Sequence, residues 1–233
     1  MELSEIGQRL HVLNRLYQAL RPELITLPAI GYACYLKYPR EWLTDDPPPK
    51  LLTQDIDVIT IDEFLGTYNP SEQRITLFAP NIQKAADLLE CREEDLRYVV
   101  RYHEHAHAAI HLGVTESERQ KCLQNCRFTA SQLRKHTKVY TNIEPILHEH
   151  LAQLVTYHVL KNLSQSGAEE MVCKAAGRML DVYNKLMQRQ PFAYRVHHYL
   201  NVPLGRLNTT IRLIKEQSLA GKFTPWKEII NLT

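Results

Sequence analysis

The feature that most constrains the fold of this 233-residue chain is a change of sequence pattern at Pro80. Before it, short β-branched and aromatic runs alternate with turn residues, which is typical of strands. After it, apolar residues recur at helical spacing almost to the C-terminus. Only 8 residues are glycine, about half the usual share, which favours long helices and few tight turns. The sequence therefore predicts an α+β fold, with a small N-terminal sheet or hairpin followed by a mainly helical body.

This pattern also predicts where the individual elements lie. A first helix is expected over residues 3–20, before the break at Pro22. The strand-like runs are 30–38, 56–61, 64–68 and 74–78, with a surface loop at 45–49 and a turn at 69–72 that joins the last two runs into a hairpin. The later helices are expected over residues 81–89, 93–112, 116–135, 143–163, 168–189 and 206–219. Gly113 is placed to end the helix over 93–112.

Composition and motif content exclude several classes of protein. The formal net charge of +2 is too small to indicate nucleic-acid binding by itself. No two glycines are close together, so the glycine-rich loops that bind dinucleotides or phosphates are absent. The N-terminus lacks the features of a signal peptide, and no apolar run approaches the roughly 18 residues that cross a membrane. Five cysteines, an odd number at scattered positions, favour a reducing compartment. We therefore expect a cytoplasmic protein without membrane contacts.

Histidine is unusually frequent, and its positions are more informative than its number. Seven of the 11 histidines fall in two segments that the spacing places on separate helices. The first segment holds His103, His105, His107 and His111, and the second holds His148, His150 and His158.

Inside the first segment, His103, Glu104 and His107 form the motif His-Glu-x-x-His. Side chains four residues apart project from one face of a helix, so His103 and His107 can bind one metal ion. Glu104 is rotated by about 100° from His103, which lets it hold a water beside the metal without ligating. Catalytic zinc sites typically keep three protein ligands and one open position, so a third ligand is required.

The second segment offers four possible third ligands, which are Glu144, His148, Glu149 and His150. Glu149 is expected to be the ligand, because it lies in the middle of a helix with an apolar body. Glu144 precedes Pro145 near the helix start, where a capping or dipole role is expected.

The remaining polar groups near this motif have less defined roles. The candidates to stabilise an oxyanion are Tyr140, His148, His150 and Tyr157, among which the sequence does not choose. Gln153, one turn beyond Glu149, is expected to support the ligand, and His111 is expected to support the site or to lie in the core.

Other metal sites are tested by their spacing. The longer motif HExxHxxGxxH requires Gly at 110 and His at 113, but the chain has Ile110 and Gly113. A di-iron bundle requires Glu-x-x-His on two helices, and the step from Glu144 to His148 is one residue too long. The Pro-Cys-x-x-Cys motif of zinc nucleobase deaminases is absent.

At this point the sequence resembles the HExxH metallopeptidases called zincins, in the gluzincin pattern in which a glutamate on a later helix completes the site. More narrowly, it is similar to the ImmA/IrrE-type domain. The similarity rests on the run His103–Ala108 extending to His111, on Glu149–Ala152 as the Glu-x-x-Ala of the ligand helix, and on a preceding hairpin around Gly66–Tyr68 and Arg74–Leu77.

The resemblance and the motif together imply a zinc-dependent metallopeptidase. One Zn²⁺ ion would be held by His103, His107 and Glu149, and Glu104 would activate a zinc-bound water to hydrolyse a peptide bond in a specific intracellular protein substrate. The strand over 74–78 is expected to be the edge along which an extended peptide adds. We expect one domain, with a zincin-like core over 1–160 (sheet 24–80, active helix 93–112, ligand helix 143–163) and a C-terminal helical extension over 165–233.

Two alternative functions are compatible with the sequence. One is a non-catalytic, metal-stabilised interaction protein whose basic C-terminal surface binds nucleic acid or an acidic partner. Between 195 and 233, six basic residues face two acidic ones, a local surplus of +4; they are Arg195, Arg206, Arg212, Lys215, Lys222 and Lys227 against Glu216 and Glu228. The other is a metal-dependent hydrolase of a non-peptide substrate. The substrate's identity, the regulation of activity and the oligomeric state are not encoded in any motif.

Overall fold

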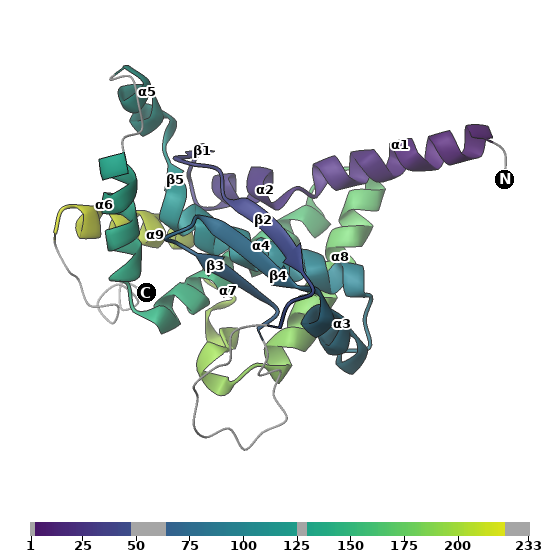
Figure 1. Cartoon of the computed structure of the whole chain (residues 1–233). Helices are drawn as coiled ribbons and strands as arrows, with labels where there is room; N and C mark the ends of the chain where they lie inside the picture. The colour runs from purple at the N-terminus through teal and green to yellow at the C-terminus, as the bar shows by residue number, and fades with distance from the viewer. Residues whose placement is uncertain (1–2, 48–63, 125–129, 222–233) are drawn as a thin grey trace.

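The computed structural model describes residues 3–47, 64–124 and 130–221, and the statements below concern these residues (Figure 1). The predicted strand over 56–61 and the end of the predicted loop over 45–49 lie outside them. The fold is α+β, as predicted, with two small sheets and a mainly helical body.

The larger sheet has three strands in the order β2 (Arg40–Thr44), β4 (Arg74–Phe78) and β3 (Gly66–Asn69). Strand β4 runs parallel to β2 and antiparallel to β3. The predicted hairpin is confirmed: the side-chain oxygen of Asn69 accepts hydrogen bonds from the N–H groups of Ser71 and Glu72 and so closes the turn. The expectation that 74–78 is an edge strand is wrong, because β4 is paired on both sides.

Residues 22–44 differ most from the sequence-based expectation, whereas α1 matches the helix predicted over 3–20. The predicted strand over 30–38 is reduced to β1 (Cys34–Tyr35), which pairs with β5 (Gly113–Val114) in a two-stranded sheet. Helix α2 (Pro22–Ala29) and strand β2 were not predicted. Pro22 occupies the first turn of α2, where its missing N–H costs nothing. Strand β2 is formed by pairing with a strand more than 30 residues away along the chain, as Arg40 with Arg74, and no local pattern encodes this.

Helices make up the rest of the described chain, close to the predicted bounds. They are α1 (Leu3–Ala19), α3 (Ala79–Leu88), α4 (Glu93–Leu112), α5 (Glu116–Gln124), α6 (Ala130–Thr141), α7 (Pro145–Gln165), α8 (Glu170–Arg189) and α9 (Leu204–Leu219), with short 3-10 helices η1 (Phe192–Tyr194) and η2 (His197–Tyr199). The single helix expected over 116–135 is wrong, because α5 and α6 are separate elements and α6 continues to Thr141. None of the helices in the described ranges is long and apolar enough to cross a membrane.

Helix α4 is the centre of the fold, and 16 of its 20 residues are buried. It packs against the three-stranded sheet through β3 and β4, and against α2, α3, α7 and α8. Buried residues of α8 and α9 belong to the same apolar cluster as those of α4 and α7. The predicted helical extension therefore contributes to the core around α4.

Gly113 ends α4, as predicted, but for a different reason. Its backbone is extended, with φ −65° and ψ 137°, and not left-handed. A Cβ atom at this position would collide with the carbonyl oxygen of Ala109 and would lie 2.8 Å from the ring of Tyr32. Glycine is needed here for close packing between the helix end and the segment before β1.

Candidate metal centre

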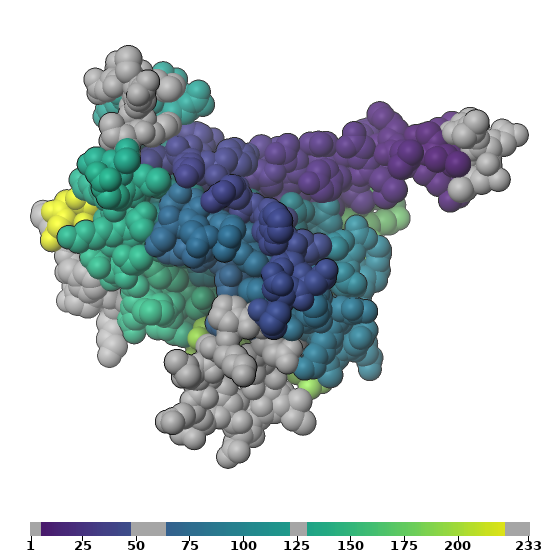
Figure 2. Space-filling model, in the orientation of Figure 1, coloured from purple at the N-terminus to yellow at the C-terminus, as the bar shows by residue number. Residues whose placement is uncertain are grey.

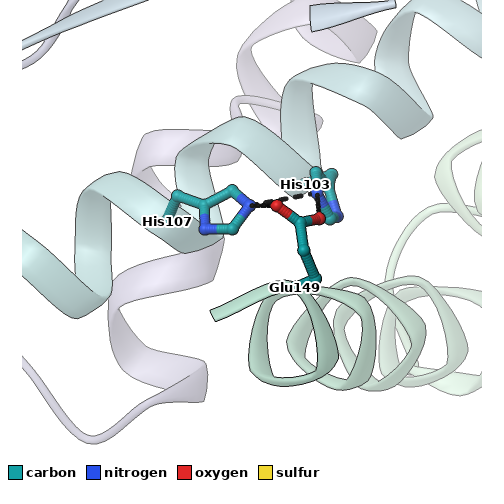
Figure 3. Close-up of side chains that lie close together, drawn as sticks. All are labelled: His103, His107 and Glu149. Atoms are coloured by element: carbon teal, nitrogen blue, oxygen red, sulfur yellow. Dashed lines mark hydrogen bonds and ion pairs between the residues drawn. The ribbon is translucent and has the colours of Figure 1, made fainter. Parts of the chain in front are cut away.

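Helices α4 and α7 bring the three predicted ligands together (Figure 3). His103 and His107 lie one turn apart on α4, and Glu149 points toward them from α7. The Nε2 atoms of the two histidines are 3.1 Å apart. Glu149 places Oε2 at 3.2 Å from Nε2 of His103 and Oε1 at 3.5 Å from Nε2 of His107. These three residues form a group that could hold a metal ion.

The dimensions of this group fit a tetrahedral ion. Ligand atoms 2.0–2.1 Å from a tetrahedral centre are separated by about 3.3–3.4 Å. The two nitrogens are 3.1 Å apart, and each lies 3.2 or 3.5 Å from one of the two oxygens of Glu149, so these separations are close to that value. Two imidazole nitrogens and a carboxylate oxygen are also a donor set that zinc accepts.

The same proximity determines the charges of the three side chains. Burial alone raises the pKa of Glu149, but the charge of His107 and hydrogen bonds from His103 and His107 outweigh burial and lower it strongly. Burial alone lowers the pKa of His103, but its hydrogen bond and attraction to Glu149 outweigh burial and raise it. The Glu149 carboxylate and a proton on His103 therefore stabilise each other.

Glu104 lies beside the group without belonging to it. Its side chain is buried, and burial raises its pKa, although the charges of His103 and His107 oppose this rise. Strand β3 passes close by: a Cβ atom on Gly66 would lie 3.0 Å from both Cγ and Oε1 of Glu104 and 2.7 Å from Val100. A side chain at position 66 would therefore displace β3 or Glu104.

Two of the four candidate oxyanion donors lie next to the ligands. The hydroxyl of Tyr140 lies 3.2 Å from Nδ1 of His107. His148 donates from Nε2 to the backbone carbonyl of Tyr140 at 2.7 Å, and the two rings lie 4.0 Å apart. Burial first, and then the charge of His107, lowers the pKa of His148 to about 4, so its ring is neutral near pH 7.

The other two candidates, and Gln153, face other parts of the molecule. His150 donates to the backbone carbonyl of Ala193, near η1. The ring of Tyr157 packs against Tyr183 of α8. Gln153 donates to the side chain of Gln190, so it braces α7 against the end of α8 and does not contact Glu149 through any described hydrogen bond.

His111, one turn beyond His107, is a buried core histidine, in agreement with one of its two expected roles. Its Nδ1 is 2.8 Å from the hydroxyl of Tyr68, and its Nε2 is 3.1 Å from the hydroxyl of Thr137. Burial, followed by the charge of Lys215, lowers its pKa to about 3. It is not part of the group that could hold a metal.

A second polar cluster, which the sequence analysis missed, lies against α4 from strand β2. Glu41 accepts a hydrogen bond from Nε of Arg101 at 2.7 Å, and its other oxygen lies 3.3 Å from Nε2 of His105. The other ring nitrogen of His105 lies 3.4 Å from the hydroxyl of Tyr35. Because Arg101 and His105 are four residues apart, they share one helix face. That spacing was visible in the sequence, but Glu41 was not identified because β2 was not predicted.

Of the six residues of the predicted basic C-terminal surface, Lys222 and Lys227 lie outside the described residues, and Lys215 is not on the surface. Lys215 is buried, donates to the carbonyl oxygen of Gly113 and lies 4.7 Å from the centroid of the Tyr32 ring. Burial lowers its pKa to about 7. Lys215 therefore ties α9 to the end of α4 and does not face solvent.

Comparisons of this chain with protein-family models, with curated proteins and with solved structures find no match.

Proposed function

We propose that this chain is a zinc-dependent metallopeptidase that hydrolyses a peptide bond in a protein substrate. The observation that carries the proposal is the group of His103 Nε2, His107 Nε2 and the Glu149 carboxylate, with a second carboxylate, Glu104, buried beside it. A ligand triangle alone would support a structural ion. The adjacent, unligated carboxylate favours hydrolysis.

The residues fall into two sets, those that would bind the metal ion and those that act on the water and the ligands. His103, His107 and Glu149 would hold the ion, which when bound would supply a water molecule acidic enough to react near neutral pH. Glu104 accepts a proton from the attacking water and passes it to the departing amine. Its raised pKa suits this exchange, because a base with a pKa nearer to 7 both accepts and releases a proton readily. Tyr140 orients His107, since a ring whose Nε2 faces an ion carries its proton on Nδ1, next to the tyrosine hydroxyl.

The position of β3 supports a peptide as the substrate. Within the described residues, β3 pairs with β4 on one side and with no strand on the other. Its first residue, Gly66, lies beside Glu104. An extended peptide that adds to the unpaired edge of β3 would carry its backbone past the ligand group. This edge replaces the strand over 74–78 that the sequence analysis assigned to the role.

The test uses metal analysis and substrate identification together. Elemental mass spectrometry of the purified protein should find about one zinc ion per protein molecule. Because an iron ion accepts the same two histidines and one carboxylate, finding iron in place of zinc would overturn the metal assignment. Cell extract incubated with the wild-type protein should yield new protein N-termini that are absent when a chelator is present.

Glu104→Gln is the decisive variant. We expect it to retain zinc and to lose cleavage by about 10²–10⁴-fold, the usual contribution of a general base. The matched control is Glu94→Gln, which makes the same change at an exposed position on the same helix, where Glu94 pairs only with the exposed Arg92. Full cleavage by a zinc-loaded Glu104→Gln protein would overturn the mechanism.

A further inference from the structure

Helix α1 presents an apolar stripe that its own body leaves open. The helix runs away from the body toward the N-terminus and forms a projecting arm (Figures 1 and 2). Leu10, Leu13 and Tyr17 are 61%, 59% and 48% exposed, whereas Leu20, at the base of the arm, is 1% exposed and belongs to the core. Soluble proteins seldom leave a continuous row of large apolar side chains in water, so this stripe marks a contact surface.

The spacing of the stripe is that of a coiled coil. Ile6, Leu10, Leu13, Tyr17 and Leu20 follow one another in steps of four, three, four and three residues. This alternation averages 3.5 residues and keeps the first four side chains on one line along α1, which ends at Ala19 just before the buried Leu20. Val12, which is 41% exposed, and Leu16, which is partly buried against the core, lie outside this line.

The arm is attached to the body along a different side. Arg15 forms an ion pair with Glu169, just before α8, and Leu16 packs partly buried against the core. On a helical wheel Leu16 is about 90° from the centre of the stripe. The stripe therefore remains accessible while α1 is held in place.

We infer that the stripe binds the same stripe of a second copy of this chain, with the two α1 helices antiparallel. A twofold axis between residues 11 and 12 pairs Leu10 with Leu13 of the second copy, and Ile6 with Tyr17 of the second copy. The stripe is thus complementary to its own reversed sequence, so a second copy offers matching apolar layers along the arm. In the parallel alternative both bodies would lie at the same end of the helix pair, whereas antiparallel pairing places each body beyond the N-terminal end of the other α1.

The residues that flank the stripe agree with this arrangement. Arg9 and Leu16 lie on one side, and antiparallel pairing sets Arg9 beside Leu16 of the second copy, so the two arginines do not meet. Gly7 and Asn14 lie on the other side. A glycine inside an exposed helix costs about 0.5–1 kcal/mol relative to alanine. A Cβ atom on Gly7 would meet nothing within 4 Å in this chain, so its own fold gives no reason for glycine, whereas a closely packed second helix would.

Sedimentation velocity of the full-length protein tests the proposal. The α1 helix is about 25 Å long, so the helix pair is smaller than a standard interface of about 1,600 Å² and we expect a weak, micromolar dimer. The wild type should pass from monomer to dimer between about 1 and 100 µM. Leu10→Glu should be monomeric throughout this range. Its matched control, Gln8→Glu, introduces the same charge on the opposite side of the helix and should dimerise like the wild type.

Other outcomes would overturn the proposal. A wild type that stays monomeric at about 100 µM, or a Leu10→Glu protein that still dimerises, would show that the stripe does not bind a second copy. Circular dichroism confirms that each variant is folded, as expected because Leu10 makes no core contact.

The orientation is read from spin labels placed singly at His11 or at Gln18, both exposed on α1. Antiparallel pairing displaces the two copies of residue 11 by about 1.5 Å along the axis and those of residue 18 by about 20 Å. The label pair at position 18 should therefore be clearly farther apart. Equal distances at the two positions would indicate parallel pairing and overturn the register.

Discussion

His103 and His111 lie on the same helix, two turns apart, and both are enclosed by other elements. The pKa of His103 is nevertheless raised, whereas that of His111 is lowered. His103 contacts a carboxylate, Glu149, whose hydrogen bond and charge outweigh burial and raise the pKa of the imidazole. The same nitrogen could bind a proton or serve as a metal ligand. His111 meets the hydroxyls of Tyr68 and Thr137, and burial lowers its pKa to about 3. A periodic row of histidines thus places side chains on one face, while the neighbouring elements determine which of them can bind a cation.

The largest contrast is expected between the removal of a proposed ligand, His107, and the removal of His111. His107→Ala should weaken zinc binding by more than about 100-fold, beyond the range of changes to residues that only orient a ligand. His111→Ala should leave zinc affinity nearly unchanged but destabilise the fold by about 1–3 kcal/mol, because the hydroxyl of Tyr68 loses its buried partner. Chelator competition measures the first quantity and urea denaturation the second. If both variants lost zinc affinity equally, the proposal that His107 is a ligand and His111 is not would be contradicted.

Lowering the pH should reduce the stability of the folded protein through His111, the buried histidine with the lowered pKa. The pKa of His111 is about 3 in the folded protein and about 6.5 when unfolded, so between these values the unfolded chain binds more protons and stability falls as the pH falls. From pH 6.5 to 4 the wild type should lose up to about 3 kcal/mol more than His111→Gln. The measurement is urea denaturation at both pH values with chelator present. Parallel losses in the two proteins would mean that His111 does not oppose protonation.

Tyr140 lies next to both His107 and His111. Its substitution tests whether its hydroxyl supports His107 as a metal ligand. Tyr140→Phe removes the hydroxyl that faces Nδ1 of His107 and keeps the ring that packs on His148. We expect zinc affinity to fall by about 10–100-fold. Tyr157→Phe is the control, since that ring packs against α8. An unchanged affinity in Tyr140→Phe would assign the tyrosine to packing alone.

The last comparison concerns strand β3, which passes beside the group of His103, His107 and Glu149. Gly66→Ala places a methyl group against Val100 and Glu104, and overpacking of this kind costs about 1–3 kcal/mol. The same substitution at Gly205, whose Cβ would meet nothing within 4 Å, is the control. Thermal denaturation should show a lower midpoint for Gly66→Ala alone. If the two variants unfold alike, β3 does not pack closely on Glu104.

The sequence predicted the parts of this molecule that depend on local periodicity. The bounds of α4 were correct at both ends, and the β3–β4 hairpin followed from the turn at Asn69. The placing of His103 and His107 on one helix face followed from their i, i+4 spacing. Glu149 is the exception among long-range contacts: it was expected because the motif requires a third ligand, although it lies near the start of α7 and not in its middle.

The parts that depend on contacts between distant segments were missed. Strand β2 exists because it pairs with β4, and this pairing is what makes β4 a central strand. Its Glu41 then meets Arg101 and His105 across 60 or more residues. Lys215 was assigned to a basic surface because composition records charge and not burial.

The position of Glu149 has a consequence for the unfolded chain. Between His107 and Glu149 the chain advances 42 residues (149 − 107) and includes α5 and α6. An ion that joins the two ends closes this loop as a crosslink does, and a covalent crosslink over the same length would remove chain entropy on the order of 4 kcal/mol from the unfolded state. A bound ion would then link α4 to α7. The metal-bound protein should therefore resist unfolding of the segment that contains α5 and α6 more than the metal-free protein does.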